Sequence, residues 1–410
     1  MLPNSGTERT TDPSVARRWA MLVASILGAM ATTCAVSGVG FLIPELHTGE
    51  GLSLGAASVL AAAPTVGLMI AIIPWGAALD RFGERRILLL SLSGTVLATL
   101  AATAASAADL GHPAIGATLL VAGMTSAATN GASGRIVVGW FPPRRRGTAM
   151  GIRQTAQPLG IGLSALTIPV LAAHHGVTAG LTVAVAMSVV GLVAVAATII
   201  DPPRTETPHA HHTDANPYRE STYLQRVHAV SVLLVIPQST LWTFVPAWLI
   251  VNHHWAPGSA GILVTVAQIL GAAGRIAAGR WSDVWGSRMK PIRLIALAAA
   301  ATSLLLALAD TVSTPLAATL MVIATVVTVA DNGLAFTGIA EFAGVGWSGR
   351  ALAIQNTGQY LATSASTPIF GHIIDSAGFP WAVAIMAAAP LVALPLIPPD
   401  HPVPEASITA

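Results

Sequence analysis

Charged residues are scarce in this 410-residue chain, since Asp, Glu, Lys and Arg together make up 9% of it and hydrophobic residues 53%. A typical soluble domain carries about 25% charged residues. Apolar blocks of roughly 20 residues recur along the chain, which is the length that a helix needs to cross ~30 Å of hydrocarbon. Because lipid offers the backbone no hydrogen-bond partners, each block must satisfy its own polar groups as a helix. The composition therefore predicts an all-α membrane protein that crosses the bilayer many times.

Several other features are missing. Cys34 is the only cysteine, so we expect no disulfide framework and no CxxC site. The chain has no Walker phosphate-binding loop, which argues against ATP as the energy source. No Ser/His/Asp or metal-ligand pattern stands out, so we expect no enzyme, cofactor or metal site. No basic patch is interleaved with aromatics, so we expect no nucleic-acid partner. Arg17 and Arg18 precede an apolar run that is too long for a cleavable signal peptide.

Twelve apolar segments are long enough to span a bilayer. The first six lie at about 19–42, 56–79, 87–107, 114–140, 149–172 and 177–200. The second six lie at about 227–251, 258–279, 292–309, 314–342, 351–374 and 380–397. We therefore predict an N-terminal six-helix bundle at 1–200, a cytoplasmic linker at 201–226 and a C-terminal six-helix bundle at 227–410. The linker contains His209, His211 and His212, but without a second ligand cluster we interpret it as a solvated connector.

Basic residues gather on one side of this predicted topology. With residue 1 in the cytoplasm, 17 of the 20 Lys and Arg lie in or beside cytoplasmic segments, and the opposite loops carry none. Positive residues favour the cytoplasmic side of a membrane. We therefore expect a plasma-membrane protein with both termini in the cytoplasm. The three remaining basic residues, Arg135, Arg153 and Arg275, fall inside predicted spans.

A charged, Gly-punctuated loop occurs twice in the chain. The first copy includes Gly76, Asp80, Arg81, Gly83, Arg85 and Arg86, and the second, 203 positions later, includes Gly279, Arg280, Asp283, Gly286 and Arg288. Further matches at an offset of 202 pair Pro44 with Pro246, Asn130 with Asn332, and segment 149–157 with 351–359. Since both loops are predicted on the same side of the membrane, the halves are parallel repeats related by an axis along the membrane normal.

Two six-helix halves, a central linker and the G-x-x-x-D-R-x-G-x-R-R loop with its second copy resemble the major facilitator superfamily over essentially the whole chain. The resemblance implies a monomeric secondary transporter whose bundles rock around a central site. It also implies that the loops act as latches. Asp80 would cap or pair with a neighbouring helix end, and Arg81, Arg85 or Arg86 would pair with acids on adjacent helices. A tight turn with topology-setting charge is the alternative.

The second latch would pair Arg280 with Glu341, which lies near the cytoplasmic end of the tenth span. In the eighth span, Arg275, Gly279 and Asp283 form R-x-x-x-G-x-x-x-D. This pattern is similar to the oxalate/formate and monocarboxylate branch, where an arginine of that helix engages the substrate carboxylate. Mammalian members carry an Asp four residues before that arginine, where this chain has Gly271.

Arg275 is the sharpest candidate for substrate contact. It lies eight residues before Asp283, which is about 12 Å along a helix and near mid-membrane. A charge there costs at least ~2.5–3.5 kcal/mol on insertion scales, so we expect a cavity or a partner. A guanidinium suits bidentate carboxylate recognition, and a structural ion pair is the alternative.

Asp331 is the expected partner of Arg275. It lies ten residues before Glu341, about 15 Å along a helix, and so at a similar depth. A buried carboxylate beside an arginine can alternate between paired and protonated forms, which makes Asp331 the proton-coupling candidate. A permanently ionised packing pair is the alternative.

Polar residues form matching stripes on the fifth and eleventh spans, where the spacing i, i+3 places both members of a pair on one helix face. They would line a central cavity or act as helix–helix contacts, with Trp242, Phe244 and Tyr360 shaping the pocket or packing. Arg153 would attract anions to the inner vestibule, and Arg135 would belong to a structural network with the latch. The predicted polar lining is Asn130, Gln154, Gln157, Asn332, Asn356 and Gln359.

These features favour proton-coupled transport of a small organic anion such as a monocarboxylate. The predicted spans contain three arginines but one clear deep acid, and this excess of positive charge suits an anionic substrate. The alternative is a drug/proton antiporter that exports hydrophobic compounds. Segment 157–162 only partly resembles the motif of efflux members in the fifth helix. A receptor with this fold would need an effector domain, which neither the linker nor the tail at 398–410 supplies.

Overall fold

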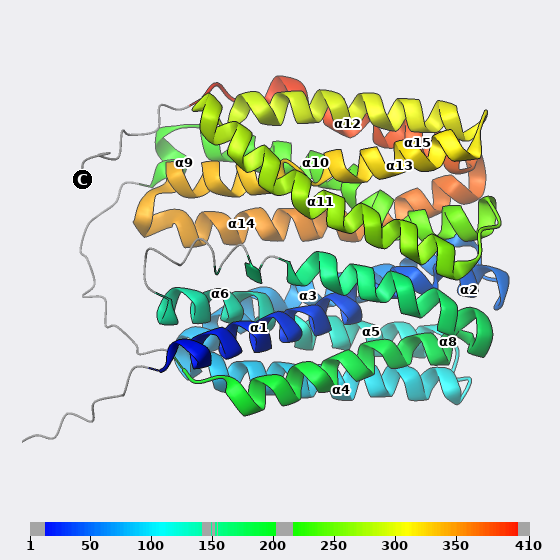
Figure 1. Ribbon diagram of the computed structural model, residues 1–410, viewed down its shortest axis with the longest axis horizontal. Coiled ribbons are helices and arrows are strands. Elements are labelled where there is room, and N and C mark those ends of the chain that lie inside the picture. Colours follow the sequence, from blue (N-terminus) through cyan, green and yellow to red (C-terminus); the bar gives the residue numbers. More distant parts are fainter. Residues whose placement is uncertain (1–12, 142–148, 150–151, 154, 202–215, 401–410) are drawn as a thin grey trace, which may run out of the picture.

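The computed structural model describes residues 13–141, 149, 152, 153, 155–201 and 216–400. Regular structure within these residues is helical throughout. Figure 1 shows two bundles that lie side by side along the long axis of the molecule, the first built from α1–α8 and the second from α10–α16.

The N-terminal bundle contains six long helices and two short ones. These are α1 (Val15–Val36), η1 (Gly38–Leu42), α2 (Ile43–Thr48), α3 (Leu54–Phe82), α4 (Glu84–Ala107), α5 (His112–Ser126), α6 (Ala128–Trp140) and α8 (Ala156–Thr198). Serines begin two of them, since the side chain of Ser14 accepts from the backbone N–H of Arg17 and that of Ser53 from Ala56. Such caps satisfy backbone donors that a helix start leaves unpaired.

The C-terminal bundle repeats this plan. It contains α9 (Pro217–Glu220), α10 (Tyr223–Ala247), η2 (Trp248–Asn252), α11 (Pro257–Trp285), α12 (Met289–Asp310), α13 (Thr314–Thr328), α14 (Asn332–Ala377), α15 (Phe379–Met386), α16 (Ala388–Ala393) and η3 (Leu394–Leu396). Gly286 ends α11 in the left-handed conformation, and Gly83, also at positive φ, separates α3 from α4. Both glycines belong to the repeated loop, and the turn requires them there.

The expected twelve spans can be identified in these helices. Nine helical stretches among the described residues are long and apolar enough to cross a membrane. One of them, α8, is two spans joined at Gly176 (φ 79°). The pair α5–α6 and the second part of α14 supply the remaining two. Gly378 (φ 86°) joins the last two spans of the second half at the same offset of 202, which extends the internal repeat.

Two of the spans are interrupted where the sequence predicted continuous helices. The fourth span breaks at Ala127, between α5 and α6, and the tenth breaks at 329–331, between α13 and α14. These breaks lie at equivalent positions, directly before Asn130-Gly131 and Asn332-Gly333. Thr, Asn and Asp favour local bonds to the backbone over continuation of a helix, and Gly has a low helix propensity.

The hydrophobic core differs between the two ends of the molecule. At the end that carries Glu45 and Asp375, which we call the closed end, one buried cluster contains residues of both bundles, from Val39 and Phe41 to Leu241 and Phe370. At the opposite end, which carries the repeated loops and which we call the basic end, each bundle has its own large cluster. Among the described residues, the large buried clusters therefore combine the two bundles at the closed end and are separate at the basic end.

Direct contacts seal the closed end. Gly261 of α11 packs on Ala165 of α8 with no room for a Cβ, and Gly371 of α14 packs in the same way on Ser58 of α3. Asp375 of α14 accepts hydrogen bonds from the backbone N–H groups of Leu54 (2.7 Å) and Gly55 (2.5 Å). A carboxylate of one bundle thus caps the first turn of α3 in the other, where the helix dipole is positive.

Candidate functional site

A pocket of about 240 Å³ lies between the two bundles, and we call it the central pocket. Gln157 and Pro158 of α8 form its wall on the N-terminal side. The C-terminal bundle contributes Trp242 of α10, Gln268 and Arg275 of α11, and Thr325 of α13. Arg275 and Gln157, two of the predicted substrate-binding residues, are therefore brought together in one site.

Arg275 is held by an aromatic ring rather than by an acid. Its guanidinium carbon lies 5.9 Å from the ring centroid of Trp242, within the range of a cation–π contact. Its Nε is buried and has no hydrogen-bond partner within the described chain. The expected ion pair with Asp331 is absent: although the two interact electrostatically, no salt bridge within 4 Å joins these two described residues. Arg275 therefore keeps its donors for the pocket.

Trp242 and Gln268 bring further hydrogen-bonding groups without partners to the same pocket. The indole Nε1 of Trp242 is buried and unpaired, and the buried side chain of Gln268 has no hydrogen bond to any described residue. Gln268 was missed by the sequence analysis. Its spacing of seven residues from Arg275 places both on one face of α11, and that periodicity could have revealed it.

Asp331 lies in the break of the tenth span and is 2% exposed. It is the residue directly before α14. Val329, at the start of the same break, lines the central pocket, so the break borders the site. The equivalent residue of the N-terminal half is Thr129, which is buried and whose Oγ1 has no partner in the described chain. The two halves thus differ by one acid at this position.

A chain of amides lies nearby. Nδ2 of Asn332 donates to Oε1 of Gln238 (2.8 Å), and Nε2 of Gln359 donates to Oδ1 of Asn332 (3.0 Å). Asn332 and Gln359 were predicted, whereas Gln238 was not. None of the three lines the central pocket. Asn356 instead donates to the carbonyl of Leu352 in its own helix (3.0 Å).

The remaining predicted polar residues have other positions. Gln154 and the side chain of Asn130 lie outside the residues that the structure describes. Arg153 is buried, its Nε donates to Oγ of Ser133 on α6 (2.9 Å), and it interacts electrostatically with Tyr360 of α14 in the other half. Arg135 forms an ion pair with Glu84 (Nε–Oε1, 2.9 Å), which confirms its expected place in a structural network with the first loop.

In the first loop, Arg85 holds the end of α8. Its Nε and Nη2 donate to the carbonyls of Ile199 (2.9 Å) and Ala196 (3.1 Å), and its backbone N–H donates to Oδ1 of Asp201 (2.6 Å). Cations are favourable at helix C-termini, so this arrangement joins α4 to α8. The side chain of Asp80 lies outside the described part of the structure.

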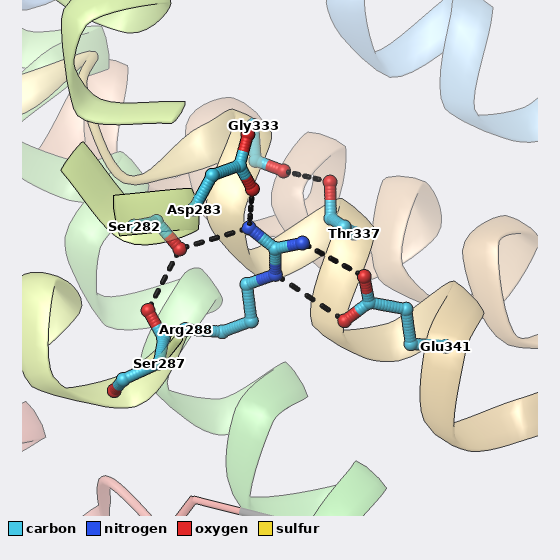
Figure 2. A network of polar contacts seen from close by, with 7 residues as sticks. All are labelled: Ser282, Asp283, Ser287, Arg288, Gly333, Thr337 and Glu341. Carbon is cyan, nitrogen blue, oxygen red and sulfur yellow. Dashed lines mark hydrogen bonds and ion pairs between the residues drawn. The ribbon is translucent and has the colours of Figure 1, made fainter. Parts of the chain in front are cut away.

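In the second loop, Arg288 is the centre of a charged cluster that joins α11, α12 and α14 (Figure 2). Its Nη1 donates to Oδ1 of Asp283 (2.5 Å) and to Oγ of Ser282 (3.0 Å), while Nε (3.3 Å) and Nη2 (2.9 Å) donate to the two oxygens of Glu341. Hydrogen bonds to Glu341 and Asp283 raise the pKa of Arg288 above its usual range. The expected partner of Glu341 was Arg280, which is exposed, and the structure places Arg288 there instead.

An aspartate caps the third span in each half. Asp400 accepts from the backbone N–H of Met289 (2.9 Å) and from Oγ of Ser287 (2.6 Å). In the N-terminal half, Asp201 accepts in the same way from the backbone N–H of Arg85 at the start of α4. Both acids follow the last helix of their half. In each bundle, a carboxylate therefore joins the segment after the last helix to the N-terminus of the third span.

Two related bundles that share a pocket and separate at one end have the architecture of a secondary transporter. The family model of the Major Facilitator Superfamily matches residues 25–367 and 227–410. The chain belongs to the major facilitator superfamily. It is therefore a multi-pass membrane transporter and not an enzyme, as the sequence predicted, and members of this family move small molecules and commonly act as monomers.

Similar proteins agree with this assignment. The chain is 46% identical over 391 residues to an uncharacterized MFS-type transporter of Mycobacterium tuberculosis, covering 94% of this chain and 86% of that protein. It is 30% identical over 165 residues, 40% of this chain and 36% of the other, to a gallate transporter of Pseudomonas putida.

Among solved structures, a D-xylose-proton symporter matches with a TM-score of 0.76 at 16% identity, covering 93% of this chain and 98% of the other. A bacterial homolog of the human lysosomal transporter Spinster, in an inward-facing and unoccupied conformation, matches with a TM-score of 0.76 at 14% identity and covers 94% of this chain and 97% of the other. At these identities the likeness shows the fold alone.

Proposed function

We propose that this transporter carries a small organic anion with a carboxylate group, which binds at Arg275 in the central pocket, and that Asp331 couples its movement to protons. One observation carries the proposal: the Nε of Arg275 and the Nε1 of Trp242 are buried donors without acceptors among the residues that the structure describes, and both line the same pocket. A buried donor without a partner costs about 1–3 kcal/mol. A carboxylate would supply the missing acceptors, and its bonds to a guanidinium would be charge-assisted.

The break in the tenth span supports an anionic substrate as well. The N-terminus of α14 begins at Asn332, inside the bundle rather than at its surface, and Val329 of the same break lines the pocket. Half-helix N-termini in transporters direct positive dipole ends toward anionic groups. Asp331, which directly precedes this N-terminus, is the acid that a proton would neutralise.

An aromatic acid is the substrate class that we favour. Trp242, Pro158 and Val329 give the pocket flat and apolar walls around Arg275, which suits a ring that carries a carboxylate. The partial relative from Pseudomonas putida is named for gallate, a hydroxylated benzoate.

We further propose that the basic end faces the cytoplasm and that the structure corresponds to an inward-facing state of a plasma-membrane protein. The positive residues gather at the basic end, as expected for a cytoplasmic side. The shared core and direct contacts at the closed end support the inward-facing state, and the bacterial relatives support the plasma membrane.

Binding of benzoate, gallate and aliphatic carboxylates to the purified protein, followed as a shift in unfolding temperature and fitted for affinity, tests the proposal. We expect an aromatic carboxylate to stabilise the wild type, and Arg275→Ala to weaken its binding at least about tenfold, because hydrogen bonds to charged groups contribute ~1.5–3 kcal/mol. Arg280→Ala is the matched control, since Arg280 is exposed on the same helix, and should bind as the wild type does.

Unchanged carboxylate affinity in Arg275→Ala would contradict the assignment of the site. If no carboxylate stabilises the protein and lipophilic cations do so in a manner that Asp331→Asn abolishes, the drug/proton antiporter is the better description.

A further inference from the structure

A second pocket lies inside the C-terminal bundle at the closed end, and we call it the outer pocket. It encloses about 390 Å³ and shares no lining residue with the central pocket. Its walls come from α10, α12, α13, α14 and α15, and are almost entirely apolar, with Phe244, Leu306, Met321, Phe379 and Val383 among them.

The main polar feature of this pocket is a buried carboxylate. The side chain of Asp310, the last residue of α12, is 3% exposed. Its Oδ1 accepts from Nε1 of Trp248 (2.9 Å) and lies 2.6 Å from Nε2 of His253. Its Oδ2 is buried and has no hydrogen-bond partner within the described residues. All of the described bonds therefore fall on one oxygen, and the other is unsatisfied.

The charge of Asp310 is poorly compensated. A carboxylate at the C-terminal end of a helix meets the negative end of the helix dipole. Nδ1 of His253 lies 3.2 Å from the hydroxyl of Thr314. The outer loops carry no Lys or Arg. Oδ2 of Asp310 is therefore a buried acceptor without a partner among the described residues, at the edge of an apolar space.

We propose that the outer pocket binds a small hydrophobic ammonium ion, with Asp310 as its counter-ion. The ammonium N–H donates to Oδ2 of Asp310, and the apolar part of the ligand occupies the space between Phe244, Leu306 and Phe379. The site differs from the proposed anion site in place and in the sign of its charge, so it does not depend on that proposal.

The probe that tests this inference is 2-phenylethylammonium, compared with two isosteres, the neutral 2-phenylethanol and the anionic 3-phenylpropanoate. Binding to the purified full-length protein is measured by titration calorimetry and as a shift in unfolding temperature. We expect the ammonium to bind more tightly than the alcohol at this site. Asp310→Asn should weaken ammonium binding at least about tenfold, because a charge-assisted hydrogen bond contributes ~1.5–3 kcal/mol.

Three further variants separate the possible causes. Val383→Phe fills the outer pocket from α15 while leaving Asp310 in place, and should weaken ammonium binding to a similar degree. Asp109→Asn removes an exposed acid at the same end of the molecule and should bind as the wild type does. Arg275→Ala should also bind the ammonium normally, which keeps this test distinct from that of the anion site.

The inference is overturned if the ammonium does not bind the wild type, if the alcohol binds equally well, or if Asp310→Asn leaves the affinity unchanged. Should Asp310→Asn fail to fold, Val383→Phe decides, and an unchanged affinity in that variant overturns the proposal.

Discussion

At the scale of single residues, the most informative difference between the halves is Asp331 against Thr129. Both are buried beside the break of an interrupted span, two positions before a glycine: Asp331 is the last residue of its break, and Thr129 lies in the first turn of α6. An ionised carboxylate in such a place is costly unless it is paired or neutralised. Asp331 has no salt bridge to Arg275, its expected partner, within the described chain, so a proton or a movement of Arg275 is needed to relieve that cost.

We therefore expect Asp331→Asn to retain exchange of substrate across the membrane while it loses accumulation driven by a proton gradient. Asn keeps the size of the side chain but takes up no proton at physiological pH. Counterflow and gradient-driven uptake of a labelled carboxylate into proteoliposomes measure the two activities separately, with Asp109→Asn as the control. Undiminished accumulation in Asp331→Asn would exclude this residue as the coupling acid.

The sequence located some of these residues well. Counting 1.5 Å per residue from Asp283 placed Arg275 near mid-membrane, and the structure finds it in the central pocket. Arg280, which the resemblance implied as the partner of Glu341, does not take that place, because Gly286 turns the chain back at the end of α11 and brings Arg288 to Glu341. A linear count along a helix contains no information on the direction that the chain takes after its cap.

At the scale of elements, the cluster around Arg288 connects the end of α11, the start of α12 and the body of α14. The guanidinium binds both oxygens of Glu341, and such a bidentate arrangement fixes orientation as well as distance. The cluster lies within one bundle, so it stiffens that bundle rather than joining the two.

Glu341→Gln should lower the stability of the purified protein by about 1 kcal/mol, since this partly exposed pair belongs to a network. Arg288→Lys should have a similar effect, because an ammonium cannot reproduce the two parallel bonds. Unfolding temperatures of both single variants and of the double variant measure the coupling. If the two losses simply add, Arg288 and Glu341 act independently, and the ion pair between them is not the source of the stability that each variant loses.

The breaks in the fourth and tenth spans show a limit of reading elements from sequence. Hydrophobicity and length predicted twelve spans, and the helices accommodate all of them. A hydropathy window averages over about 19 residues, so it cannot detect a break of one to three residues. The Asn-Gly pairs at 130–131 and 332–333 indicate these breaks in the sequence. The internal repeat revealed both pairs, but the prediction of the spans did not use them.

At the scale of the whole molecule, the two bundles share buried apolar contacts at the closed end and have separate cores at the basic end. To open the closed end, the protein must separate Gly261 from Ala165 and Gly371 from Ser58. It must also break the cap that Asp375 places on α3.

Asp375→Ala should therefore shift the protein toward states that are open at the closed end. Loss of a helix cap costs ~1 kcal/mol, which corresponds to a roughly fivefold change in the ratio of the two states. Distances between spin labels placed across each end, measured by electron paramagnetic resonance in lipid, report the populations. Asp109→Asn again serves as the control, and equal distance distributions in Asp375→Ala and the wild type would show that the cap does not hold the gate.

The single cysteine has a practical consequence for all such measurements. Cys34 is 1% exposed, and its thiol lies against the carbonyl of Gly160, at 3.6 Å, between α1 and α8. A thiol reagent cannot reach it without separating these two helices. The wild-type chain therefore serves as its own nearly silent background for maleimide labelling. New cysteines at either end can then be followed in the otherwise unaltered protein, including in living cells.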